Sequence, residues 1–152
     1  MLRRDFLKTL FGYFSNVLAG MVFPSPAFSK WSAQNFAAGD FATQFRAVFA
    51  DLPISDSQEI VINLPEIAEN GAVVPITISS DLADIQRLYI WIEKNPTPLA
   101  AEFELSDSMA VYLTARIKMA ESCPVIVIAQ QGDHLLQAQK WVNVMHGGCG
   151  TG

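Results

Sequence analysis

The hydrophobic pattern of this chain changes at Pro53 from a helical period to an alternating one. Before Pro53, aromatic and aliphatic residues recur three or four positions apart, which predicts one amphipathic helix or a broken pair of helices. A stripe this rich in phenylalanine is more typical of a helix that packs on a sheet than of a ligand groove. The stripe consists of Phe36, Phe41, Phe45, Val48, Phe49 and Leu52.

After Pro53, apolar and polar residues alternate in short segments that are separated by turn signals such as Asn70-Gly71 and Gln131-Gly132-Asp133. Seven segments of this kind predict a mainly β fold, an immunoglobulin-like antiparallel β-sandwich preceded by the N-terminal helix. The predicted strands cover residues 60–64, 74–78, 88–92, 101–105, 111–119, 125–128 and 136–144.

The segment 88–92 is apolar on both faces, because Tyr89 and Trp91 alternate with isoleucines. Together with the phenylalanine stripe, it leads us to expect apolar surface that is exposed when the chain is alone. We therefore predict a heterodimer with a similar β-sandwich subunit.

Composition narrows the class of protein. The chain has 152 residues, of which 51% are hydrophobic and 16% charged, with a formal net charge of -5. These values are typical of one globular domain, and the acidic balance without a Lys/Arg cluster argues against nucleic-acid binding. Neither a glycine-rich nucleotide loop nor a nucleophile-elbow motif is present, so we expect neither an enzyme nor a cofactor.

Residues 1–29 have the three parts of an export signal. Arg3-Arg4 precedes Phe6-Leu7-Lys8, a moderately apolar run follows, and Ala27 and Ser29 form a small-x-small cleavage pattern. The paired arginines resemble the twin-arginine type, which predicts a periplasmic protein with no membrane attachment after signal removal. The alternative, an uncleaved anchor, is disfavoured because Gly12, Asn16 and Gly20 interrupt a short apolar run. The β-sandwich domain would then occupy residues 30–145.

Residues 146–152 form a tail, His146-Gly147-Gly148-Cys149-Gly150-Thr151-Gly152, that contains one sulfur among glycines. Glycine has no Cβ, so Gly147, Gly148, Gly150 and Gly152 favour a flexible arm rather than packed structure. Its six residues from Gly147 span about 20 Å when extended. An exposed cysteine is an oxidation liability, which favours a reactive role for Cys149 over an incidental one.

Four residues could in principle hold zinc: Cys123, His134, His146 and Cys149. We do not expect a metal site, because His134 lies in a turn at the far end of the last strand from His146. As an imidazolium, His146 would favour the Cys149 thiolate, but it is equally well explained as a polar residue that ends a strand. Cys123 is expected to be a small buried hydrophobe, and the alternative is a disulfide to Cys149.

Several motifs of the chain resemble the SoxY family, the sulfur-carrier subunits of the periplasmic thiosulfate-oxidising (Sox) complex. The most specific is the terminal Gly147-Gly148-Cys149-Gly150, although Thr151 stands where the family usually has a second glycine. The other motifs are Ile67-Ala68-Glu69-Asn70-Gly71, Val74-Pro75-Ile76, Lys94-Asn95-Pro96-Thr97-Pro98, Phe103-Glu104-Leu105 and Thr114-Ala115-Arg116-Ile117-Lys118-Met119.

The resemblance implies that Cys149 carries the sulfur substrate covalently and that the tail enters the active sites of partner enzymes. It implies a heterodimer with a SoxZ-like β-sandwich, and partner enzymes that are a haem oxidase, a dimanganese sulfate hydrolase and, in some organisms, a sulfane dehydrogenase. Two alternatives are a periplasmic thiol redox or metal-transfer protein and an adhesion-like sandwich with an inert tail.

Overall fold

The computed structural model describes residues 33–50, 52–106 and 109–145, and these form one compact unit that is mostly β-sheet. The larger sheet has strand order β1-β9-β8-β5-β6, with β3 also paired to β9, and the smaller has order β2-β4-β7. The strands are β1 (Ile54–Asp56), β2 (Ile60–Asn63), β3 (Ile67–Ala68), β4 (Val74–Ser80), β5 (Arg87–Ile92), β6 (Leu99–Glu104), β7 (Val111–Ile117), β8 (Cys123–Gln131) and β9 (His134–Val144).

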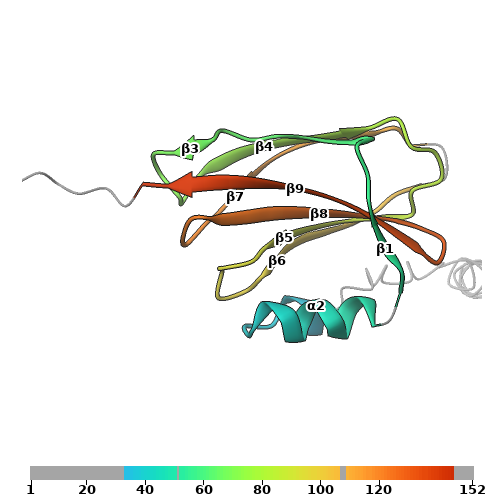
Figure 1. The fold of residues 1–152 in the computed structure, drawn as a ribbon, viewed down its shortest axis with the longest axis horizontal. Helices are drawn as coiled ribbons and strands as arrows, with labels where there is room; N and C mark the ends of the chain where they lie inside the picture. The colour runs from blue at the N-terminus through green and yellow to red at the C-terminus, as the bar shows by residue number, and fades with distance from the viewer. Residues whose placement is uncertain (1–32, 51, 107–108, 146–152) are drawn as a thin grey trace, which may run out of the picture. The chain divides into compact units, whose positions relative to one another are not determined.

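The two sheets enclose the main core, to which each contributes the inward half of its alternating residues. Val74, Ile76 and Ile78 of β4 face Ile90 of β5 and Val127 of β8 in this core. The predicted β-sandwich is therefore confirmed (Figure 1).

A second core lies on the other face of the larger sheet, beneath the predicted helix. The phenylalanine stripe forms a broken pair, the 3-10 helix η2 (Ala33–Phe36) and the α-helix α2 (Phe41–Phe49). Asp40 caps α2, because its carboxylate accepts a hydrogen bond from the Thr43 amide at 3.0 Å. The helix packs below β5 and β6, so the structure has three layers (Figure 1).

The position of this helix contradicts the expectation that strand 88–92 exposes apolar surface when the chain is alone. Tyr89 and Trp91 are only 3% and 0% exposed, because rings of α2 cover them. Phe49 packs edge-on against Tyr89 with 4.9 Å between ring centroids, and Phe45 packs against Trp91 at 5.3 Å. The apolar strand 88–92 is therefore satisfied within the chain, and it is not an exposed surface that awaits a partner.

The structure also adds two strands that the sequence pattern did not predict. β1 and β3 both pair with β9 in parallel, in the registers Ile54↔Leu135 and Ile67↔Asn143. The larger sheet is therefore not purely antiparallel. The remaining pairings, such as the β8–β9 hairpin that turns at Gly132, are antiparallel as predicted.

Among the described residues, no helix has both the length and the apolar character that crossing a membrane requires.

Candidate functional site: the root of the C-terminal tail

The end of β9 is held on both sides, which matters because the cysteine tail begins two residues later. On one side, the Val144 amide donates to Ser122 Oγ at 2.8 Å. On the other, β3 pairs with Val144 through Ala68, and the Met145 amide donates to the Ala68 carbonyl at 2.9 Å. The backbone is thus fixed by hydrogen bonds up to Met145, the last residue described.

The Asn70-Gly71 turn lies directly against this root. The Asn70 side chain accepts a hydrogen bond from the Ala72 amide at 2.9 Å, which closes the turn that the sequence predicts. Gly71 approaches the β7–β8 turn so closely that a Cβ there would lie 2.3 Å from the Met119 carbonyl oxygen. The Met119 amide in turn donates to the Gly71 carbonyl at 2.7 Å. This position requires glycine because backbone, not a movable side chain, occupies the space.

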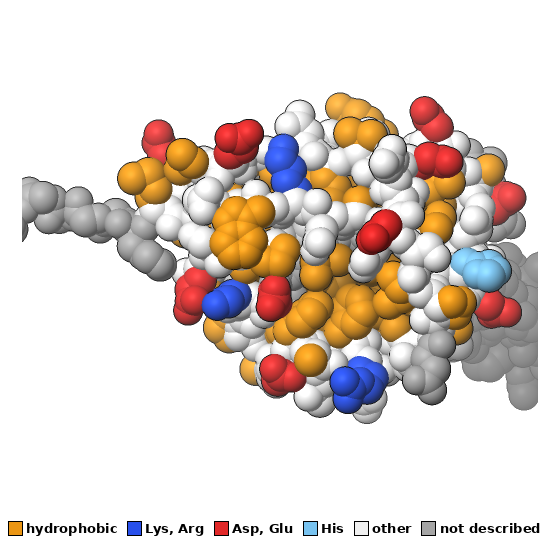
Figure 2. Space-filling model, in the orientation of Figure 1, with side chains coloured by type: hydrophobic (Ala, Val, Ile, Leu, Met, Phe, Trp, Pro, Cys, Tyr) orange, Lys and Arg blue, Asp and Glu red, His pale blue; other side chains and the backbone are white. Residues whose placement is uncertain are grey.

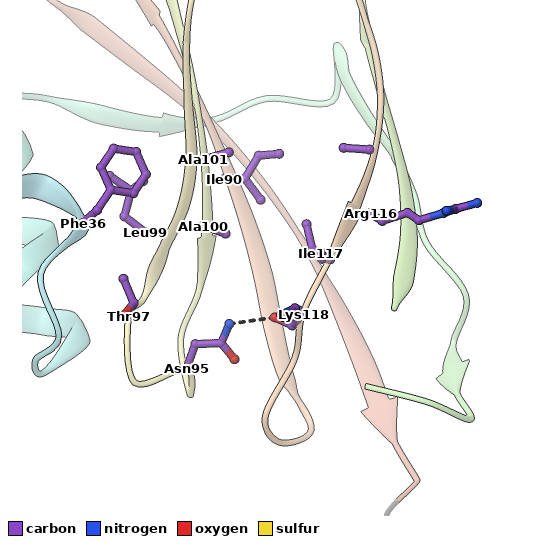
Figure 3. A pocket seen from close by; sticks show the side chains of 11 residues that line it. Phe36, Ile90, Asn95, Thr97, Leu99, Ala100, Ala101, Arg116, Ile117 and Lys118 are labelled. Carbon is purple, nitrogen blue, oxygen red and sulfur yellow. Dashed lines mark hydrogen bonds between the residues drawn. The ribbon is translucent and has the colours of Figure 1, made fainter. Parts of the chain in front are cut away.

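Asn95 holds the β7–β8 turn from the opposite side. Its amide nitrogen donates to the Lys118 carbonyl at 2.7 Å (Figure 3). Its oxygen accepts from the Ala120 amide at 2.9 Å. Two motifs far apart in the sequence, residues 94–98 and 114–119, therefore meet here. Through Met119 and Ser122, this turn links the Asn95 loop to the Asn70-Gly71 turn and to the end of β9.

Among the open grooves that border these loops in the described part of the chain, two adjoin the β7–β8 turn. One, of about 480 Å³, lies beside the root of the tail. Its lining residues include Asn70, Gly71, Met119, Val144 and Met145. The other, of about 350 Å³, lies where β6 faces β7 and is lined mainly by apolar and small side chains. Arg116 lines it too, but its guanidinium points away from the space (Figure 3).

Every residue predicted to carry or tune the chemistry lies outside the described residues. This holds for Cys149, for the glycines at 147, 148, 150 and 152, and for His146. The predicted export signal, residues 1–29, also lies outside them. The roles assigned to these residues stay predictions.

Cys123 is buried, as the sequence predicted. Its exposure is 0%, it pairs with Val142 across the β8–β9 hairpin, and it is a free thiol in the core between the sheets. Burial raises the pKa of this thiol, because the charged thiolate would lose its hydration. Cys123 therefore lacks the accessible thiolate that a reactive cysteine needs.

His134 is the first residue of β9 and is exposed, so the full length of the strand separates it from Val144 at the other end. Within residues 33–50, 52–106 and 109–145, no three His, Cys, Asp or Glu side chains form a group that could hold a metal ion.

Sequence reasoning missed the residues that hold the root. The bonds of Ser122 and Asn95 reach partners 22 to 25 positions away in the sequence, so no local pattern reveals them. The position of Asn95 immediately before Pro96 indicated only a loop.

The fold and the site define the class of protein: an immunoglobulin-like β-sandwich whose last strand, firmly held at its end, leads into a cysteine-containing tail. The family model described as "Sulfur oxidation protein SoxY" matches residues 45–149. The chain therefore belongs to the SoxY family, and the resemblance noted in its motifs is confirmed.

A solved structure is similar to this chain as well, the sulfur carrier protein SoxY from Chlorobium limicola f thiosulfatophilum. The two are 34% identical, the match covers 68% of this chain and 94% of that one, and the TM-score is 0.63. No curated protein matches the chain. The comparisons give no support to the alternative of a thiol redox or metal-transfer protein.

Proposed function

We propose that this protein is a sulfur carrier of thiosulfate oxidation that holds its substrate covalently on the thiol of Cys149. The observation that carries the proposal is the extent of the family match, which runs from residue 45 to residue 149 and so includes this cysteine. Cys123, the other cysteine of the chain, is buried and cannot serve as the attachment site. The similar Chlorobium protein is itself called a sulfur carrier.

The chemistry proceeds in two steps that partner enzymes catalyse. First, the Cys149 thiolate and the outer sulfur of thiosulfate form a disulfide bond, which gives a cysteine S-thiosulfonate. Two electrons leave in this step, and the haem oxidase would accept them one at a time. Water then cleaves the bond between the outer sulfur and the sulfonate group, releasing sulfate and two protons and leaving a cysteine persulfide anion. The carrier supplies the thiolate, and the catalytic groups belong to the partners.

The composition of the tail suits this role. Gly147, Gly148 and Gly150 add no side-chain bulk beside the sulfur, so a narrow active site can admit it. Thr151 is bulkier than the glycine usual in the family and would meet the deepest part of such a site. His146 either stabilises the thiolate or is only a polar residue that follows the last strand, and the pH dependence of alkylation separates the two.

The proposal also includes the cellular location of the protein and its partner proteins. A signal of the twin-arginine type would place the mature chain in the periplasm, where the haem oxidase, the sulfate hydrolase and, where present, the sulfane dehydrogenase would act on it. A SoxZ-like β-sandwich subunit would form the heterodimer. Because α2 covers Tyr89 and Trp91, that subunit must bind elsewhere on the domain.

Intact-mass measurement tests the function. After incubation with thiosulfate and the haem oxidase, the mature protein should gain one thiosulfate adduct, and peptide mapping should place it on Cys149. Cys149→Ser should gain none, whereas Cys123→Ala, the matched control, should load normally. An adduct on Cys123, or normal thiosulfate turnover by Cys149→Ser, would refute the proposal.

A further inference from the structure

Three exposed apolar side chains lie on the last residues before the tail or on the neighbouring strand β3: Ile67, Trp141 and Met145. Their exposed fractions are 57%, 55% and 58%. On the visible face of the molecule, separate hydrophobic side chains lie near the end of β9, with acidic and basic side chains among them (Figure 2). We call these three residues the collar.

The collar lies on the outer face of the larger sheet. Along β9 the side chains alternate, so Val142 is fully buried while Trp141 and Asn143 face outward. Ile67 pairs with Asn143, and its neighbour Ala68 is the one that enters the core. Ile67 therefore shares the outer face with Trp141, diagonally across the strand pair, within the reach of a long side chain.

Hydrogen bonds fix the backbone of the collar and the orientation of the Trp141 ring. Trp141 Nε1 donates to Asn143 Oδ1 at 2.9 Å, and the Asn143 amide donates to the Glu66 carbonyl at 2.9 Å. Met145 donates to the Ala68 carbonyl, as described above. A preorganised apolar surface loses little entropy when a partner covers it, which is a property of docking surfaces.

The length of the tail indicates which partner surface covers the collar. Cys149 lies four residues beyond Met145, so even a fully extended chain carries its Cα at most about 14 Å away. An active site that buries the sulfur must therefore bring the surface around its entrance to the root of the tail. The collar is the apolar surface that such an entrance would meet.

We propose that the collar is the docking surface for the rim of the active-site entrance of the enzymes that act on Cys149, and that this rim is apolar. This inference rests on the proposed carrier function. Trp141 is the expected anchor, because tryptophan is enriched among the residues that dominate binding energy at interfaces. With only three apolar side chains the contact is small, which suits a carrier that must leave one enzyme and visit the next.

Two other exposed apolar residues do not fit this role. Tyr112 and Val61 lie on the smaller sheet, where both align with Ser79 of β4. The root of the tail lies near the opposite end of β4, where Val74 pairs with Ile117. Five residues of extended strand separate Tyr112 from Ile117, a distance of about 17 Å. Tyr112, which is 75% exposed, is therefore a matched control for Trp141.

The test is the kinetics of Cys149 loading by the haem oxidase, with the mature chain in complex with its subunit partner. The double variant Trp141→Gln/Met145→Gln should raise KM for the carrier about tenfold or more, with kcat nearly unchanged. Its alkylation by iodoacetamide should match wild type, because a small reagent needs no docking surface. Tyr112→Gln should leave KM unchanged.

Two outcomes would overturn the collar proposal. One is an unchanged KM for the double variant. The other is loss of the β-sandwich subunit on co-purification, which would assign these residues to the heterodimer interface. Failure of the wild-type protein to load at all would instead refute the carrier function, so the two proposals fail separately.

Discussion

At the scale of single residues, Gly71 is the position where one added carbon should disturb the root of the tail. In Gly71→Ala the new Cβ would lie 2.3 Å from the Met119 carbonyl oxygen and 2.8 Å from Val144 Cγ1. We expect the free energy of unfolding to fall by about 1–3 kcal/mol, since the turn must shift to relieve the overlap. Denaturant unfolding measures this loss.

Gly39→Ala is the matched control, because its Cβ would meet only the side chain of Gln44, whose exposed Nε2 end can rotate away from its hydrogen bond to the Ala37 carbonyl. We expect its stability to change by less than about 0.5 kcal/mol. Equal losses of unfolding free energy in the two variants would mean that the close approach at Gly71 does not account for the effect.

The buried thiol of Cys123 should make stability depend on alkaline pH. Burial raises its pKa in the folded protein above the ordinary value of 9.0, so the unfolded chain loses this proton first. The stability that this group contributes is therefore present below pH 9.0 and declines as pH rises above it.

Unfolding of wild type and Cys123→Ala across this range checks the sign of the effect. The stability advantage of wild type should shrink above pH 9.0. Tyr89, whose pKa burial also raises, is present in both proteins and cancels. An advantage that stays constant with pH would contradict the expectation.

At the scale of elements, α2 covers the outer face of β5, so this strand needs no second subunit to bury it. The ring of Phe49 lies 4.8 Å from Phe45, 4.9 Å from Tyr89 and 5.9 Å from Trp91, measured between centroids. Phe49→Ala should therefore cost about 3–5 kcal/mol of unfolding free energy and leave Tyr89 and Trp91 partly uncovered.

Arg46→Ala, at an exposed position of the same helix, should change stability by less than about 0.5 kcal/mol. Tryptophan fluorescence of the Phe49 variant should also shift to the red as Trp91 gains contact with water. If Phe49→Ala is as stable as Arg46→Ala, the helix is not the cover that the structure indicates.

The elements also show where sequence patterns stop being informative. The seven longer strands and the helix could be predicted from the sequence, because each has at least four residues with a periodic pattern or, in β5 and β8, an apolar run buried on both faces. β1 and β3 have three and two residues, too few for alternation to be recognised, and they exist because β9 offers an unpaired edge. A helix packed on a sheet was predicted, but not that it would lie on the apolar strand 88–92 and cover Tyr89 and Trp91.

The candidate site, too, could be predicted only in part from the sequence. The tail was recognisable because cysteine among glycines is a local motif, while the bonds from Ser122 and Asn95 that fix its root join segments distant in the sequence. The collar was not predicted either. Whether Ile67 shares a face with Trp141 depends on the register of β3 against β9, which the sequence does not reveal.

At the scale of the whole molecule, removal of the tail should leave the fold intact. The described core consists of residues up to Val144, so a mature chain that ends at Met145 should keep its free energy of unfolding within about 0.5 kcal/mol. It should lose all sulfur loading, because Cys149 is gone.

A chain that ends at Val142 is the matched control, because it also removes the anchored end of β9. It loses the bonds from the Asn143 amide to Glu66 and from the Val144 amide to Ser122, together with the packing of Val144 on the core. At about 0.5–1.5 kcal/mol for each hydrogen bond, this chain should be less stable by a few kcal/mol. Denaturant unfolding of both truncated chains, with intact mass for loading, tests the separation. If the chain that ends at Met145 is destabilised as much as the shorter one, residues 146–152 belong to the fold and a freely presented carrier tail is ruled out.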